Sequence, residues 1–145
     1  MHREATMADV PEMVQMGIDG LRKHPAPRQV IAVDKLQRMA QECVAGPRNF
    51  AWVGCVNDTP MAALCALVHD QTFYERKQAS VVQFWTREPG LGEPLINIFL
   101  DWARQTRAIK AIVFTLEAGA DPRIIDLLNR KGLALQEHPI LVEWK

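Results

Sequence analysis

Arg87-Glu88-Pro89-Gly90-Leu91-Gly92 is the most informative stretch of the chain. The residues before it, Ala79 to Thr86, are largely apolar and partly β-branched or aromatic, which predicts a strand. After it, apolar residues recur at helical spacing, namely Leu91, Leu95, Ile98, Phe99 and Trp102. A glycine-containing turn at the start of a helix presents backbone N–H groups to an anion and lets that anion approach closely. The turn therefore predicts a diphosphate site, although glycines that only relieve strain in a plain loop are the alternative.

The residues after this helix predict one more strand, a second helix and a final strand. Ala111 to Leu116 is fully apolar, which is typical of a strand buried on both faces. Asp121-Pro122 combines a helix cap with a first-turn proline, and Gly132 is a typical helix end. Between them, the apolar face consists of Ile124, Ile125, Leu127 and Leu128. Ile140 to Trp144 predicts the last strand.

The first part of the chain predicts a short strand followed by two helices. His2 to Thr6 is the strand, and Asp9 with Glu12 three residues later forms a capping-box pattern for the first helix. The prolines within Lys23 to Pro27 end that helix. The second helix begins at Val33 or Asp34 and ends at Gly46-Pro47.

Consecutive strands in the middle of the chain determine the fold class. Phe50 to Val56 and Met61 to Val68 flank the turn signal Asn57-Asp58-Thr59-Pro60, which predicts an antiparallel hairpin. A polar loop, Tyr74 to Gln78, precedes the strand that leads into the glycine turn. The element order is β-α-α-β-β-β-α-β-α-β, an α/β (α+β) fold with a mixed, mostly antiparallel central sheet flanked by helices. We expect a single domain, 1–145, and the consecutive strands disfavour a doubly wound nucleotide-binding sheet.

Composition excludes several classes of function. The chain has 145 residues and a formal net charge of zero, which disfavours a nucleic-acid partner. Three cysteines, Cys43, Cys55 and Cys65, lack metal-ligand spacing, and the scattered histidines predict no metal site. No apolar run is long enough to cross a membrane, and Met1 to Arg3 lead directly into patterned sequence. We therefore expect a cytoplasmic protein with reduced, buried thiols.

The sequence resembles the GNAT family of N-acyltransferases. The residues that carry the resemblance are Arg87-x-x-Gly90-x-Gly92, Trp102-Ala103-Arg104, the strand Ala111 to Leu116, Asn129-Arg130-Lys131-Gly132-Leu133, and the opening Arg3 to Pro11. They span nearly the whole chain and agree with the element order above. The chain is also similar to the compact GNAT proteins of phage and prophage genomes.

The resemblance implies a site for acetyl-CoA. Its diphosphate would lie on the turn residues Arg87, Glu88, Pro89, Gly90, Leu91 and Gly92. Its pantetheine arm would insert where two parallel strands part, near Thr86 and Leu116, with backbone contacts from Phe84, Trp85 and Thr86. Phe84 and Trp85 stand where the family often has Val-x-Pro. Asp121 occupies a position where many members carry an asparagine near the cofactor, although helix capping alone explains it fully.

Catalytic residues are harder to assign. Family members often have a tyrosine, four residues before the glycine, that protonates the departing thiolate, and Leu128 stands at that position here. For the base that deprotonates the acceptor amine, the resemblance favours Glu117, just past a strand, followed by His69 and Asp70. Tyr74 is an alternative acid. The loop with His24 and Arg28 would border the acceptor.

Two functions follow from these expectations. The first is an N-acetyltransferase that moves an acetyl group from acetyl-CoA directly to a primary amine of a small-molecule or peptide acceptor. The alternative is a non-catalytic GNAT-like module that binds CoA or a protein partner. The acceptor stays open, and so does a homodimer, for which an apolar group such as Trp144 could form an interface.

Overall fold

The computed structural model describes residues 1–23, 30–71, 73–114 and 122–132. The chain divides into two compact units, Met1–Thr115 and Leu116–Lys145. The first unit holds a five-stranded sheet with helices α1, α2 and α3, and in the second the structure describes helix α4 and the two residues that follow it. The expectation of a single domain stays a prediction.

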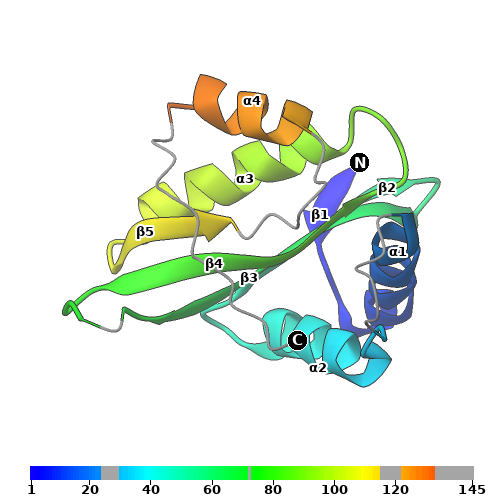
Figure 1. Ribbon diagram of the computed structural model, residues 1–145, viewed down its shortest axis with the longest axis horizontal. Helices are drawn as coiled ribbons and strands as arrows, with labels where there is room; N and C mark the ends of the chain where they lie inside the picture. Colours follow the sequence, from blue (N-terminus) through cyan, green and yellow to red (C-terminus); the bar gives the residue numbers. More distant parts are fainter. Residues whose placement is uncertain (24–29, 72, 115–121, 133–145) are drawn as a thin grey trace, which may run out of the picture. The chain divides into compact units, whose positions relative to one another are not determined.

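The elements follow the predicted order as far as they are described (Figure 1). They are β1 (His2–Glu4), a 3₁₀ turn η1 (Met7–Asp9), α1 (Val10–Lys23), α2 (Val33–Ala45), β2 (Phe50–Val56), β3 (Thr59–Asp70), β4 (Lys77–Thr86), α3 (Gly92–Gln105), β5 (Ile109–Phe114) and α4 (Pro122–Arg130). The predicted strand Ile140 to Trp144 lies outside the described residues.

The sheet has the order β1-β2-β3-β4-β5. β1, β2, β3 and β4 pair antiparallel, whereas β4 and β5 pair parallel. Helices α1 and α2 cover one face of this sheet and α3 covers the other (Figure 1). The mixed, mostly antiparallel sheet flanked by helices is therefore confirmed.

The β2–β3 hairpin forms where the sequence predicts it. Asn57 and Asp58 both have positive φ, 50° and 64°, which a two-residue hairpin turn requires and which these two residue types tolerate. The end of β3 and the start of β4 extend further than expected, because β3 continues to Asp70 and β4 already begins at Lys77.

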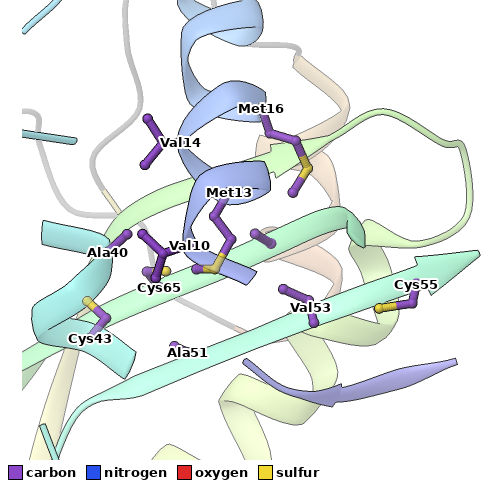
Figure 2. Packing of buried hydrophobic residues seen from close by; sticks show 11 residues of the cluster. Val10, Met13, Val14, Met16, Ala40, Cys43, Ala51, Val53, Cys55 and Cys65 are labelled. Atoms are coloured by element: carbon purple, nitrogen blue, oxygen red, sulfur yellow. The ribbon is translucent and has the colours of Figure 1, made fainter. Parts of the chain in front are cut away.

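The face under α1 and α2 is an apolar core (Figure 2). Side chains from α1 and α2 meet those of β2 and β3, including Met13, Met16, Ala40, Val53 and Ala63. The three cysteines lie in this core as free, buried thiols. A hydrogen bond with Cys43, together with burial, holds the pKa of the Cys65 thiol well above its usual range, which favours the protonated thiol at neutral pH.

Aromatic rings attach α3 to the opposite face. Phe99 is fully buried and lies 5.2 Å from Phe50 on β2 and 5.9 Å from Phe114 on β5, measured between ring centroids. Trp102 adds a contact to Phe50 at 5.0 Å. These rings fix the position of α3, and with it the turn at its N-terminus.

The predicted cap of the first helix is wrong. Thr6, rather than Asp9, stands at the N-cap of η1, and the Asp9 carboxylate accepts a hydrogen bond from the Thr6 N–H at 2.8 Å. Asp9 is buried and also accepts two hydrogen bonds from Arg3, at 2.7 and 2.9 Å. Glu12 instead contacts Arg87, so tertiary partners decide which of two overlapping capping patterns is used.

The burial expected for the strand Ala111 to Leu116 is also wrong. β5 runs from Ile109 to Phe114, and only Ile109 is buried, whereas Val113 is 37% exposed. Among the described strands β5 is the last in the sheet, which explains why its apolar residues are only partly covered.

The ion pair between Asp9 and Arg3 should make the free energy of unfolding depend on pH. The Arg3 hydrogen bonds lower the pKa of the Asp9 carboxyl, so its contribution is complete above the unfolded pKa of about 3.9 and is lost as pH falls through the folded value. We expect Asp9→Asn to reduce the free energy of unfolding by about 2–3 kcal/mol at pH 7, because it leaves Arg3 without its partner. Thermal unfolding at pH 7 and pH 3 measures both effects.

Asp58→Asn is the matched control, because Asp58 is 3.7 Å from Arg3 but its side chain is 81% exposed. We expect this control to change stability by less than about 1 kcal/mol. An Asp9→Asn deficit as large at pH 3 as at pH 7 would contradict the assignment.

Candidate functional site

The glycine turn lies between a strand and a helix, as predicted. β4 ends at Thr86, residues 87–91 form the turn, and α3 begins at Gly92 with Leu91 as its N-cap. The N–H groups of Leu91 and Gly92 precede the first intrahelical hydrogen bonds, so they stand at the positive end of the helix dipole. Gly90 has φ +86°, and a Cβ added there would have nothing within 4 Å, which leaves open space beside the turn.

Contacts to three strands hold the turn in place. At its start, the Arg87 N–H donates to the Met61 carbonyl of β3 at 2.7 Å. At its end, the His2 imidazole of β1 lies 3.1 Å from the Leu91 carbonyl oxygen. Leu91 also packs toward Gly54 of β2. The turn is thus fixed before any ligand arrives, which lowers the entropic cost of binding.

Gly92 allows α3 to start close against β4. A Cβ at this position would lie 2.9 Å from the Thr86 Cγ2 and 3.1 Å from the Phe84 Cζ. Both contacts are tighter than ordinary Cβ contacts, so a side chain at this position would need Thr86 or Phe84 to move. They also show that Phe84 and Thr86 point their side chains to the α3 face of the sheet.

The described pairing of β4 with β5 ends at Val81, five residues before the end of β4 at Thr86. Their parallel pairing runs from Lys77 opposite Ile109 to Val81 opposite Phe114. On the β3 side, Cys65 pairs with Gln83 and Ala66 pairs with Val81, so Val82 forms a β-bulge at the same level. Beyond it, no described residue pairs with Val82 to Thr86 on the β5 side, and we call this stretch the open edge of β4.

Backbone groups along this edge can be assigned from the register. N–H and C=O groups of successive strand residues point to alternate edges. Because the Arg87 N–H bonds to β3, the backbone of Trp85 also faces β3, whereas that of Phe84 and Thr86 faces the open edge. Two of the three predicted backbone contacts therefore lie at the open edge, and the Trp85 backbone does not.

Trp85 and Arg87 point to the other face, toward α1. The Trp85 indole packs against α1 so closely that a Cβ on Gly20 would lie 2.7 Å from it, and one on Gly17 3.2 Å. The Arg87 guanidinium donates to Glu12 at 2.9 Å and to Asp19 at 3.1 Å. The structure thus places this cation on α1 rather than at the start of α3.

Gln83 is a polar group that the sequence patterns did not single out. It is buried, and its amide nitrogen donates to the Leu36 carbonyl at 3.2 Å, whereas its side-chain oxygen has no partner among the described residues. The indole N–H of Trp85, two residues along the same strand, is likewise buried and has no partner within the described part of the chain. A glutamine inside the apolar run 79–86 could have indicated this buried polar group from the sequence, since a buried polar side chain needs a hydrogen-bond partner.

His69 lies far from the turn. It pairs with Gln78 near the start of β4, eight residues before Thr86, a separation of about 26 Å along the strand. Its ring lies 2.8 Å from the Ser80 hydroxyl and is exposed. Asp70 beside it is equally remote from the turn, and its carboxylate accepts a hydrogen bond from Lys77 at 2.8 Å, which lowers its pKa.

The remaining residues that the sequence analysis singled out lie at the tip of the β3–β4 hairpin, in α4, or outside the described residues. Tyr74 is 66% exposed near the tip of the β3–β4 hairpin, with Arg76 over its ring. Outside the described residues lie Glu117, Asp121, His24, Arg28 and Trp144. Leu128 is buried within α4, so the position of the family's tyrosine is filled by an apolar side chain here.

The described part of the chain offers neither a metal site nor a membrane span. It contains no group of three His, Cys, Asp or Glu side chains that could hold a metal ion. None of the described helices is both long and apolar enough to span a bilayer.

Several known structures match the fold of this chain over nearly their whole length. A predicted acetyltransferase from Clostridium acetobutylicum, solved with acetyl-CoA, matches with a TM-score of 0.76 at 15% identity, over 99% of this chain and 95% of that one. A possible acetyltransferase from Clostridium difficile 630 matches with a TM-score of 0.75 at 13% identity, over 100% and 96%. The chain has the GNAT fold.

The same fold occurs in an aminoglycoside acetyltransferase from an uncultured soil metagenomic sample, solved with sisomicin. Its TM-score is 0.67 at 12% identity, over 100% of this chain and 95% of that one. No protein-family model and no curated protein sequence matches the chain. At these identities the likeness establishes the GNAT fold, and function has to be argued from the site.

Proposed function

We propose that the chain is a GNAT-type N-acetyltransferase that uses acetyl-CoA to acetylate a primary amine. The observation that carries this proposal is the combination of a pre-formed anion turn and an open strand edge at the same end of β4. Solved proteins with the same fold include one crystallised with acetyl-CoA. This combination fits a ligand that has both a diphosphate and an extended amide-containing arm.

The described residues fit such a ligand in two places. Backbone N–H groups of Leu91 and Gly92 would receive the diphosphate, since oxygen anions bind at helix N-termini without a dedicated side chain. Backbone groups of Phe84 and Thr86 would hydrogen-bond the amides of the arm, as an added strand does at a sheet edge. When bound, acetyl-CoA supplies a thioester carbonyl activated for attack by an amine.

In the transfer, the amine nitrogen bonds to the carbonyl carbon, the C–S bond breaks, and the CoA sulfur leaves as a thiolate. The amine must lose a proton, and the thiolate takes a proton from water and ends as a thiol. Glu117, which follows β5 in the sequence, is our proposal for the group that takes the amine proton. His69, whose ring lies 2.8 Å from the Ser80 hydroxyl on β4, is the second candidate for this role.

Release of free thiol from acetyl-CoA tests the activity. The amine panel should contain aminoglycosides, polyamines, small primary amines and peptides with a free N-terminus. We expect thiol release that requires both protein and one class of amine. Glu117→Gln should lower kcat by about 10²–10⁴-fold while leaving acetyl-CoA affinity unchanged. Glu75→Gln, a change of equal charge at an exposed hairpin position, should leave kcat unchanged.

The second candidate is a GNAT-fold module that binds CoA without catalysis. Leu128 favours it, because a leucine cannot protonate a departing thiolate. Acetyl-CoA binding without thiol release from any amine in the panel would support this candidate and contradict the first. Release with one amine would rule it out.

A further inference from the structure

Arg87 is the only basic side chain in the stretch 87–93, and the motif alone would make it the diphosphate ligand. Its contacts are different. One terminal guanidinium nitrogen donates to the Glu12 carboxylate at 2.9 Å, and the other donates to the Asp19 carboxylate at 3.1 Å. The carboxylates are 48% and 44% exposed, so solvent screening leaves each of these charge-assisted hydrogen bonds a modest contribution. Both terminal nitrogens of the guanidinium therefore have carboxylate partners.

The strand geometry directs this side chain away from the anion turn. Successive side chains of a strand point to opposite faces. Thr86 faces α3, because its methyl group lies near Gly92, whereas Trp85 packs on Gly17 and Gly20 of α1. Arg87 follows Thr86 and lies on the α1 side. The sheet separates α1 from α3, so the guanidinium and the α3 N-terminus lie on different faces (Figure 1).

The charges on α1 favour this arrangement. Glu12 and Asp19 are two helical turns apart on one side of α1, and Gln15 between them donates to Asp19 at 2.9 Å. The hydrogen bond from Gln15, together with Arg87, lowers the pKa of Asp19. Moving Arg87 to a phosphate would break both of these ion pairs.

We propose that Arg87 is a positioning residue that clamps the start of the cofactor turn onto α1 through Glu12 and Asp19, while backbone N–H groups alone receive the diphosphate. This inference rests on the proposed acetyl-CoA site. It extends that site by one consequence: acetyl-CoA affinity depends on side chains of α1 that touch no part of the ligand. The packing of Trp85 on Gly17 and Gly20 acts beside the clamp, at the same end of β4.

A double-mutant cycle tests the clamp. The variants are Arg87→Met, the pair Glu12→Gln with Asp19→Asn, and all three changes together, with acetyl-CoA affinity measured by calorimetry. For a positioning role we expect Arg87→Met and the carboxylate pair each to weaken binding by about threefold to tenfold, and the triple variant to be no weaker than either. Arg107→Met, which removes an exposed arginine outside these contacts, controls for the change in net charge.

Two results would overturn the proposal. If Arg87 binds phosphate, Arg87→Met should weaken acetyl-CoA binding about a hundredfold or more, while loss of the carboxylates should leave binding unchanged or tighten it. Acetyl-CoA affinities equal to wild type in all three variants would also contradict it. S-acetylpantetheine, which lacks the diphosphate, serves as a second ligand: a positioning role predicts weakening for it too, whereas a phosphate ligand predicts none.

Thermal unfolding of the ligand-free variants separates this inference from the proposed function. Wild-type protein that binds no acetyl-CoA would remove the proposed function, yet the clamp would still predict non-additive changes in Tm across the same cycle. Additive changes in Tm, in a protein that does bind acetyl-CoA, would remove the clamp and leave the function standing.

Discussion

Gly90→Asp is expected to abolish acetyl-CoA binding, with an increase in Kd of at least about a hundredfold. The new carboxylate would stand beside the position proposed for the diphosphate, and like charges about 4 Å apart near a protein surface repel by about 4 kcal/mol. Gly90 also has φ +86°, which costs a substituted residue about 1 kcal/mol of strain. Calorimetry with acetyl-CoA measures the Kd, and Tm of the free protein measures the strain.

Gly90→Asn separates these two effects, because asparagine has the same size and tolerates positive φ but carries no charge. In the ligand-free protein nothing lies within 4 Å of the added Cβ, so both variants should have similar Tm values. We expect the asparagine variant to bind at least about tenfold more tightly than the aspartate variant. Equal affinities would mean that no anionic group of the ligand comes near Gly90.

Phe99→Ala is expected to have the largest effect on stability, a loss of about 3–5 kcal/mol in the free energy of unfolding. Phe99 is fully buried and its ring contacts Phe50, Trp102 and Phe114, so alanine would leave a cavity between α3, β2 and β5. For a chain of this length the Tm should fall by about 10 °C or more. Urea unfolding followed by circular dichroism gives the free energy directly.

Phe73→Ala is the matched control, since Phe73 is 87% exposed and the same atoms are removed. Its free energy of unfolding should stay within about 0.5 kcal/mol of wild type. Phe99→Leu, which keeps most of the buried volume, should lose less than about 1.5 kcal/mol. A Phe99→Ala loss no larger than that of Phe73→Ala would contradict the role of Phe99 in holding α3.

Local sequence signals predicted the elements that local chemistry controls. The Asn57-Asp58 turn formed because these residue types accept the positive φ that the hairpin needs. The turn at Arg87 to Gly92 was predictable because each of its two glycines meets a local steric requirement. Gly90 adopts a positive φ, and Gly92 leaves room for Phe84 and Thr86. Such requirements act within a few residues and are visible in the sequence.

Long-range partners decided what the sequence could not predict. Thr6 to Asp9 and Asp9 to Glu12 are both three residues apart, and the choice between them depends on Arg3 and Arg87. The distance of His69 from the turn depends on the β3–β4 register, which no motif encodes. The side of the sheet that Arg87 faces depends on where β4 ends and on the acidic residues of α1.

A crystal structure of the chain with acetyl-CoA would show whether this turn and strand edge hold the cofactor. We predict the diphosphate at the backbone N–H groups of Leu91 and Gly92, and the pantetheine arm hydrogen-bonded to the backbone of Phe84 and Thr86. We also predict that Arg87 keeps both of its carboxylate partners on α1. A diphosphate held by the Arg87 guanidinium, or an acetyl-CoA molecule bound away from this turn and strand edge, would contradict these assignments.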